Sequence, residues 1–294
     1  MVHSTLSNST LSRLAIFDLD GTLLNTIADL GEACNYALRC NGFPEHQPDE
    51  YPHLVGNGVN KLIERALPEG HKDEATVLRL RETFIPYYDT HNMVHTQPYE
   101  GITEVLQHLR KAGYRLAVAS NKYQQATETL VAHFFPNLFD VVYGERLGVP
   151  RKPNPQIVFD ILHTLSEQDT LSPLAQSPKM EKIFPDVTDG TYKSICLYPA
   201  SIAKDETKVP SAQLSNSDSV PTSNSTKCGL TSNSEAVYIG DSLVDIATAR
   251  NAHLPVIACA WGFCAKQDLI DAHPDYLITE PKALKEILSS LPME

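Results

Sequence analysis

The sequence predicts an α/β fold in which a parallel sheet carries a smaller helical block, inserted after its first strand. The first observation behind this prediction is that short apolar segments alternate with longer stretches of helical pattern along most of the chain. Such alternation is typical of a parallel sheet that helices cover on both faces. The second observation is the stretch 26–97, where about seventy residues show helical patterns and little strand signal.

The strands of the predicted sheet are short, and most of them end at a polar residue or a glycine. The first is Leu14–Phe17, an apolar run that stops at Asp18. A run of this length with an abrupt polar stop indicates a buried parallel strand that leads into a loop. Further strands are expected at 115–119, 236–239, 255–260 and 276–278.

Helical patterns lie between these strands and indicate two domains. A core domain is expected to comprise residues 13–25 and 98–294, and a helical cap domain is expected to comprise residues 26–97. Because the cap interrupts the core directly after the first strand, we expect it to act as a lid. The core helices are expected at 102–111, 124–133, 155–165, 243–251 and 281–288, and the cap helices at 28–40, 59–66 and 75–88.

A second interruption, residues 167–234, is expected to be a partly disordered surface insertion within the core. Between Ser211 and Ser234, 14 of 24 residues are Ser, Thr or Asn, so this part has little apolar surface to bury. The earlier part contains two apolar segments, at 183–185 and 195–198, which suffice for a small local cluster or hairpin. No catalytic role is assigned to this insertion.

The composition is that of an ordinary globular protein and argues against several kinds of partner. Hydrophobic residues make up 42% of the chain and charged residues 20%. The formal net charge of −12 argues against nucleic-acid binding, which needs a basic face. No apolar stretch of membrane-spanning length and no signal peptide is evident, so no membrane partner is expected. The six cysteines are scattered without a CxxC pair, which indicates reduced thiols and a cytoplasmic protein.

Two carboxylates follow the first predicted strand, in the segment Asp18-Leu19-Asp20-Gly21-Thr22. One of them can attack phosphorus as a nucleophile while the other transfers protons to the leaving group and from water. Gly21 permits a sharp turn of the backbone, and Thr22 can offer a hydroxyl or N–H to a phosphate oxygen. The alternative is an ordinary turn or helix N-cap, and this motif alone does not decide between the two.

Two further segments carry groups that can bind phosphate. Ser120 and Asn121 follow the strand at 115–119, and their hydroxyl and amide can donate hydrogen bonds to phosphate oxygens. Lys152 lies beside prolines, so a stiff loop can aim its ammonium group at an oxyanion. The alternatives are a helix N-cap for the first segment and an unremarkable surface lysine for the second.

The fourth segment, Gly240-Asp241-Ser242-Leu243-Val244-Asp245, combines a strand end with the start of a helix. Asp241 ends the strand and Asp245 lies one helical turn later, so both can face the same crevice. Mg²⁺ prefers one or two carboxylates together with water and substrate phosphate, and Asp18 with Asp241 can supply that pair. Helix capping is again the alternative.

Together the four motifs are far more specific than any one of them, because each supplies a different part of phosphate chemistry. Their combination and order resemble the haloacid dehalogenase superfamily of phosphotransferases, over about 230 of the 294 residues. The resemblance implies a Rossmann-like parallel sheet, a small α-helical cap and hydrolysis through an aspartyl-phosphate. It further implies that Asp18 is the nucleophile and that Asp20 is the general acid/base. The implied phosphate ligands are Ser120, Asn121 and Lys152; the implied Mg²⁺ ligands are Asp18, Asp20 (through its backbone carbonyl) and Asp241, supported by Ser242 and Asp245.

Within the cap, residues 54–67 look like phosphoglycolate phosphatases, so the expected substrate is a small phosphate ester such as 2-phosphoglycolate. Glycines on both sides of Asn57 would let backbone N–H groups approach a small anion. Arg65 is a candidate partner for the substrate carboxylate, and the alternative is a surface charge on an amphipathic helix. Asn25 departs from the family pattern, which often has Asp at this place.

Two other functions remain open at this point. A sugar phosphomutase would use the same covalent chemistry but pass the phosphoryl group to a second hydroxyl instead of water. A non-catalytic scaffold could keep the fold and use the 167–234 insertion for docking, although clustered carboxylates that repel one another argue against it. The sequence does not distinguish a monomer from a homodimer.

Overall fold

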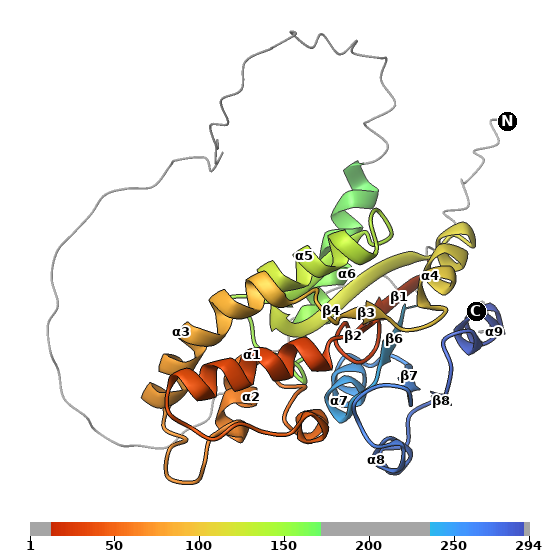
Figure 1. Ribbon diagram of the computed structural model, residues 1–294. Helices are drawn as coiled ribbons and strands as arrows, with labels where there is room; N and C mark the ends of the chain where they lie inside the picture. The colour runs from red at the N-terminus through yellow and green to blue at the C-terminus, as the bar shows by residue number, and fades with distance from the viewer. Residues whose placement is uncertain (1–12, 172–235, 291–294) are drawn as a thin grey trace, which may run out of the picture. The chain divides into compact units, whose positions relative to one another are not determined.

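The computed structural model describes residues 13–171 and 236–290, which form the fold drawn in colour in Figure 1. The N-terminal tail and most of the expected insertion, 172–234, lie outside the described residues. Within the described ranges, no helix is both long enough and apolar enough to cross a membrane.

Six parallel strands form the central sheet. In order across the sheet they are β5 (Val141–Glu145), β4 (Arg115–Tyr123), β1 (Leu14–Phe17), β6 (Ala236–Gly240), β7 (Val256–Cys259) and β8 (Tyr276–Ile278). Counted along the chain, these strands follow the order 3-2-1-4-5-6 of a doubly wound Rossmann fold. The predicted fold class is therefore confirmed. The strand order reverses between β1 and β6, and ligands of such folds bind at the carboxyl ends of the strands at this point.

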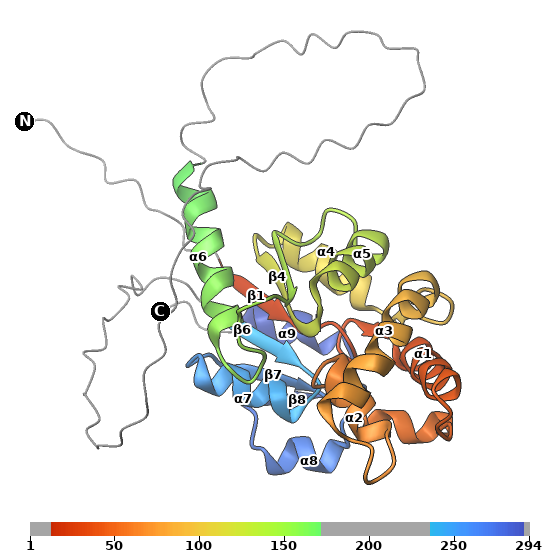
Figure 2. The same cartoon turned by 90° about the vertical axis from the view of Figure 1, so that its left-hand side faces the viewer.

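Helices cover both faces of the sheet (Figure 2). They are α4 (Ile102–Lys111), α5 (Gln124–Phe134), α6 (Gln156–Leu171), α7 (Leu243–Asn251), α8 (Lys266–Asp271) and α9 (Ala283–Ser290). Successive side chains of a strand point to opposite faces. Ala15 and Phe17 of β1 belong to one hydrophobic cluster with residues of α4, α5 and α9. Leu14 and Ile16 belong to a second cluster with residues of α6, α7 and α8.

Residues 26–97, which we call the cap, are mainly helical and enclose a hydrophobic cluster. The elements are α1 (Ile27–Cys40), the 3-10 helix η1 (Pro48–His53), α2 (Val59–Ala66) and α3 (Glu74–His91). Leu38, Ile63 and Phe84 lie in this cluster with no exposed surface. Ala126 of α5 joins the same cluster, so the cap packs against a helix of the core.

Two short strands connect the cap to the sheet. β2 (Leu24–Asn25) and β3 (Gln97–Pro98) pair in antiparallel fashion, so the chain enters and leaves the cap side by side. The buried carboxylate of Asp29 holds the chain just before β3. It accepts hydrogen bonds from the backbone N–H of His95 at 2.9 Å, and from the N–H and hydroxyl of Thr96 at 2.9 and 2.7 Å.

Several elements differ from the sequence-based expectation. β5 was not expected, because it is an edge strand in which most side chains are only partly buried. β4 continues through the polar residues 120–123, which are largely buried at the site. Helix α6 includes residues 167–171, which were expected to begin the insertion. α8 was not expected because, of its residues, Leu269 alone is buried.

Replacing Asp29 with alanine is expected to lower the free energy of unfolding by about 2–4 kcal/mol, because buried donors lose their acceptor. Urea denaturation followed by circular dichroism measures this difference. The matched control is Glu32→Ala, at an exposed position of the same helix, which should change the free energy by less than about 0.5 kcal/mol. Equal effects of the two substitutions would contradict the role assigned to the Asp29 carboxylate.

Candidate active site

The candidate site lies at the carboxyl ends of β1 and β6, where the strand order reverses. Asp18 directly follows β1 and Asp241 directly follows β6, so two adjacent strands bring their carboxylates to one edge of the sheet. Oxygen atoms of Asp18, Asp241 and Asp245 lie within 4.8 Å of one another. The structure thus brings together carboxylates that the sequence places in separate motifs.

Gly21 shapes the loop that follows β1. Its φ angle is +87°, and a Cβ atom at this position would lie 2.2 Å from a carboxylate oxygen of Asp241. Both facts demand glycine. The next residue, Thr22, donates its hydroxyl to Asp241 Oδ1 at 2.8 Å, and the N–H of Phe263 donates to Oδ2 at 2.8 Å. The hydroxyl of Thr22 therefore orients Asp241, and the expected contact of Thr22 with a phosphate oxygen, by its hydroxyl or its N–H, stays a prediction.

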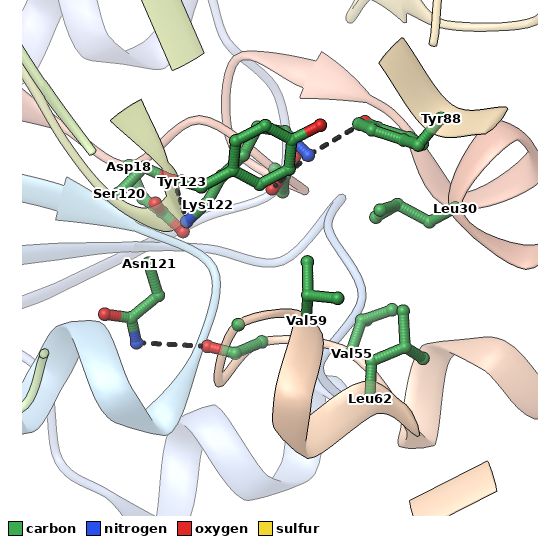
Figure 3. Close-up of a pocket in the computed structure, with 13 residues that line it drawn as sticks. Asp18, Leu30, Val55, Val59, Leu62, Tyr88, Ser120, Asn121, Lys122 and Tyr123 are labelled. Carbon is green, nitrogen blue, oxygen red and sulfur yellow. Dashed lines mark hydrogen bonds and ion pairs between the residues drawn. The ribbon is translucent and has the colours of Figure 1, made fainter. Parts of the chain in front are cut away.

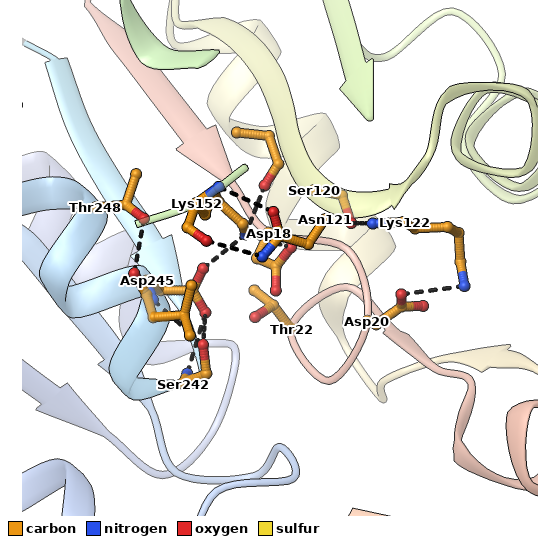
Figure 4. Close-up of polar contacts among 12 residues, drawn as sticks. Asp18, Asp20, Thr22, Ser120, Asn121, Lys122, Lys152, Ser242, Asp245 and Thr248 are labelled. Carbon is orange, nitrogen blue, oxygen red and sulfur yellow. Dashed lines mark hydrogen bonds and ion pairs between the residues drawn. The ribbon is translucent and has the colours of Figure 1, made fainter. Parts of the chain in front are cut away.

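Lys152 is buried between two of the carboxylates (Figure 4). Its Nζ lies 2.8 Å from Asp18 Oδ1 and 2.8 Å from Asp245 Oδ1. The same ammonium group donates to the carbonyl of Ala119 at 2.8 Å and to the hydroxyl of Tyr238 at 3.1 Å. A buried cation with this many partners is fixed in position. The interpretation of Lys152 as a surface lysine is excluded.

Ser242 and Asp245 form a capping box at the start of α7. Asp245 Oδ2 accepts hydrogen bonds from the N–H and the hydroxyl of Ser242 at 3.1 and 2.6 Å, and the Ser242 hydroxyl oxygen accepts the N–H of Asp245 at 3.2 Å. The capping interpretation of this motif is therefore correct. It does not exclude a role in the site, because the other oxygen of Asp245 contacts Lys152.

Asn121 holds the loop that carries Lys152. Its Oδ1 accepts the N–H of Lys152 at 3.0 Å, and its Nδ2 donates to the carbonyls of Lys152 and Gly56 at 3.3 and 3.4 Å. The expected phosphate ligand thus uses its side chain to position another expected ligand. Ser120 is buried and lines a cavity beside Asp18.

Asp20 is held by residues that the motif analysis did not assign to the site. Its Oδ1 accepts the hydroxyl of Thr26 at 2.7 Å, and its Oδ2 lies 3.1 Å from Lys122 Nζ. Lys122 also donates to the hydroxyl of Tyr88, in the cap, at 2.8 Å. The only feature of the sequence that pointed to Lys122 was its position next to Ser120 and Asn121. No feature of the sequence pointed to Tyr88.

Two cavities meet at Asp18 and Asp20. The larger, of about 320 Å³, lies beside Asp241 and is also lined by Asn57 and Arg65. The smaller, of about 40 Å³, lies between the end of β4 and the cap helices (Figure 3). We call these the metal-side cavity and the cap-side cavity.

The two candidate substrate ligands of the cap contact each other. Arg65 donates to the carbonyls of Leu54 and Val55 at 3.0 Å each, and to Asn57 Oδ1 at 2.6 Å. Its guanidinium group therefore ties together the loop that lines the metal-side cavity. Arg65 is near the site, as expected, but much of its hydrogen-bonding capacity is used within the cap.

Burial raises the pKa of Asp18 to about 7; the charge of Asp245 adds to this rise and Lys152 opposes it. Burial also raises the pKa of Asp241, and the charges of Asp245 and Asp18 add to it. Burial by itself would lower the pKa of Lys152, but the charges of Asp18 and Asp245 raise it well above its ordinary value. The ammonium of Lys152 therefore stays charged. Its single positive charge does not by itself neutralise the negative charges of the three carboxylates.

The oxygen atoms of this cluster suit a divalent cation. Each oxygen of Asp241 accepts one hydrogen bond, which leaves further lone pairs for a ligand. Asp18 uses Oδ1 for Lys152, and its Oδ2 has no hydrogen-bond partner among the described residues. Hard cations such as Mg²⁺ take carboxylate oxygens as ligands, and such a cation would offset the repulsion between the buried carboxylates.

Comparison with known proteins identifies the family. Residues 15–171, more than half of the chain, match the haloacid dehalogenase-like hydrolases. The chain belongs to this family. Phosphatases of the haloacid dehalogenase family generally use a divalent metal, with which the acidic cluster of this hydrolase is compatible.

The relatives of this haloacid dehalogenase-like hydrolase include phosphoglycolate phosphatases. One from Agrobacterium fabrum is 30% identical over 280 residues, covering 95% of this chain and 93% of the relative. One from Aquifex aeolicus is 31% identical over 157 residues, covering 53% of this chain and 71% of the relative. The crystal structure of an inferred phosphoglycolate phosphatase from Lactobacillus delbrueckii subsp. bulgaricus gives a TM-score of 0.65 at 28% identity, covering 94% of this chain and 97% of that chain. The protein is thus a phosphoric monoester hydrolase.

A divalent cation is expected to stabilise the metal-free protein more strongly at about pH 8 than at about pH 5. Between the ordinary Asp pKa of 3.8 and about 7, the unfolded chain releases a proton that folded Asp18 retains. The contribution of this group to stability therefore falls as the pH rises through that range. A cation binds to ionised carboxylates. The stabilisation of the folded protein by the bound cation therefore increases as the pH rises over the same range.

Thermal unfolding at both pH values, with and without Mg²⁺, measures this effect as a shift of Tm by several degrees. Asp241→Asn is the control, because it removes one proposed ligand and should reduce the shift at the higher pH. A shift of the same size in both proteins at both pH values would rule out cation binding at this cluster.

Proposed function

We propose that this hydrolase is a Mg²⁺-dependent phosphatase that converts 2-phosphoglycolate to glycolate and phosphate through an aspartyl-phosphate on Asp18. The observation that carries the proposal is the contact of Asp18 with the buried ammonium of Lys152, next to Asp241. This arrangement supplies a nucleophile, a cation for the phosphoryl oxygens and oxygen ligands for a metal at one point of the sheet.

In the first step, Asp18 attacks phosphorus. One carboxylate oxygen of Asp18 forms the new bond to phosphorus, and Lys152, 2.8 Å from Oδ1, orients the carboxylate. The ester P–O bond breaks, and its oxygen takes a proton from Asp20. Mg²⁺ held by Asp18, the Asp20 backbone carbonyl and Asp241 would reduce the repulsion between the carboxylate and the phosphate.

In the second step, water attacks the phosphorus of the aspartyl-phosphate. Asp20, now a carboxylate, takes a proton from that water, and the bond between Asp18 and phosphorus breaks to release phosphate. The hydrogen bond from Thr26 and the ion pair with Lys122 hold both oxygens of Asp20. The general acid of the first step is therefore in place as the general base of the second.

A small substrate is supported by the cap-side cavity. Its volume is about 40 Å³, and one water molecule needs on the order of 10–15 Å³. An alcohol part that enters this cavity can therefore have only a few non-hydrogen atoms, and glycolate is of that size. The activity named for the Agrobacterium fabrum relative supports the same substrate.

Two alternative functions are less well supported. A sugar phosphomutase would pass the phosphoryl group of the aspartyl-phosphate to a second hydroxyl, whereas the Agrobacterium fabrum relative is named as a phosphatase. A non-catalytic scaffold gains nothing from buried carboxylates with raised pKa values, which lower the stability of the fold at neutral pH.

We also place this phosphatase in the cytoplasm. The cysteines in the described part of the chain, Cys34, Cys40, Cys259 and Cys264, are free thiols. Free thiols are typical of proteins in reducing compartments.

Asp18→Asn is expected to reduce phosphate release from 2-phosphoglycolate with Mg²⁺ by about a thousand-fold or more, because a neutral amide cannot attack phosphorus. Steady-state release of inorganic phosphate measures this loss. Asp49→Asn, the same change at an exposed position of the cap, is the control and should retain the wild-type rate.

Substantial turnover by folded Asp18→Asn would refute the assigned nucleophile. Conversion of a hexose 1-phosphate to its 6-phosphate by the wild type, without phosphate release, would favour the mutase instead.

A further inference from the structure

Lys122 is a buried cation that the proposed mechanism uses only to hold Asp20. Its side chain is 3% exposed, and Nζ contacts Asp20 Oδ2 at 3.1 Å and the Tyr88 hydroxyl at 2.8 Å. Burial of an ammonium group costs free energy unless charged or polar partners compensate it. A hydroxyl could hold Asp20 at lower cost, as Thr26 already does on the other oxygen.

We propose that Lys122 binds a carboxylate on the alcohol part of the substrate and so selects phosphate esters of short hydroxy acids. The proposal rests on the proposed phosphatase function and names the residue that determines its substrate specificity. Tyr88 of the cap holds the ammonium of Lys122 in the binding position.

The ammonium of Lys122 has a hydrogen-bond donor to spare. Asp20 is the one carboxylate within ion-pair distance of Lys122 among residues 13–171 and 236–290. A lysine ammonium has three N–H donors, and Asp20 and the Tyr88 hydroxyl occupy two of them. The third can be donated to a substrate carboxylate. Lys152, in contrast, has two carboxylate partners.

The position of Lys122 agrees with this role. In Figure 4, Lys122 and Lys152 lie on opposite sides of Asp20, and Lys152 contacts the nucleophile. A phosphoryl group at Asp18 would place the ester oxygen near Asp20 and the alcohol part beyond it, toward Lys122. Figure 3 shows Lys122 and Tyr88 at the cap-side cavity, opposite Asn121.

Lys122 is the charged donor that the described lining of the cap-side cavity offers to an anion. Leu30, Val59 and Leu62 line it from the cap and offer only apolar side chains. Lys122 is the only cation among the described residues that line this cavity. The Tyr88 hydroxyl accepts from Lys122 and donates to no described residue, so its proton can serve a second hydrogen bond to the carboxylate.

Arg65, the cation expected to bind the carboxylate, is less suited to it. It lines the metal-side cavity and not the cap-side cavity. Its guanidinium already bonds two carbonyls and the side chain of Asn57. We therefore assign Arg65 to the structure of the cap loop and the recognition of charge to Lys122.

The decisive experiment compares two esters of similar size, 2-phosphoglycolate and the uncharged analogue 2-hydroxyethyl phosphate, with Mg²⁺. For the wild type, kcat/KM for 2-phosphoglycolate should be on the order of 10- to 100-fold higher, which corresponds to one charge-assisted hydrogen bond. Lys122→Met should abolish this preference, with a rise in KM for 2-phosphoglycolate. Any effect of Lys122 on Asp20 changes kcat/KM for both esters equally and so leaves the ratio unchanged.

Arg65→Met is the matched control, because it removes the rival cation. It should leave the ratio of the two kcat/KM values as in the wild type, and Tyr88→Phe should reduce the ratio by a few fold. Equal losses for both esters in Lys122→Met, or loss of the preference in Arg65→Met alone, would overturn the proposal while the phosphatase function stands.

The wild-type ratio tests the proposal even if Lys122→Met does not fold, because equal kcat/KM values for the two esters would overturn it. Failure of the wild type to hydrolyse either ester, or any other small phosphate ester, would instead refute the proposed function itself.

Discussion

One buried ammonium group holds the site together. Lys152 contacts Asp18 at the end of β1 and Asp245 on α7, and it also donates to the carbonyl of Ala119 in β4. Without this cation, buried like charges would face one another across the end of the sheet. The strand order β4-β1-β6 makes the arrangement possible, because three neighbouring strands end at this point. Asn121, also on β4, fixes the loop of Lys152 through both of its amide atoms.

A second buried ammonium group, that of Lys122, links the sheet to the cap. It bridges Asp20 in the core and Tyr88 on α3, so Asp20 and the cap share one partner. The two lysines divide the substrate between them in our account: Lys152 serves the phosphoryl group and Lys122 serves the alcohol part.

Much of the fold and the centre of the site follow from the sequence. Apolar runs that stop at polar residues mark β1, β4 and β6, and the ends of parallel strands share one edge, so the convergence of Asp18 and Asp241 was predictable. The hydrogen-bond partners of the site residues were not predictable from the sequence. Thr22 and Asn121, the expected phosphate ligands, hold Asp241 and Lys152 through their side chains, and their binding to phosphate stays a prediction. The contact between Lys122 and Tyr88 joins a strand end to a cap helix, and strand or helix periodicity carries no signal for such packing.

The central claim is that Asp18 becomes covalently phosphorylated. The most direct test is to quench the wild-type protein with acid early in a single turnover of 2-phosphoglycolate, because every turnover passes through the aspartyl-phosphate. Mass spectrometry of the digested protein should then find a phosphoryl group on the peptide that contains Asp18. A phosphoryl group on another residue, or turnover with no phosphorylated peptide at any time, would contradict the account.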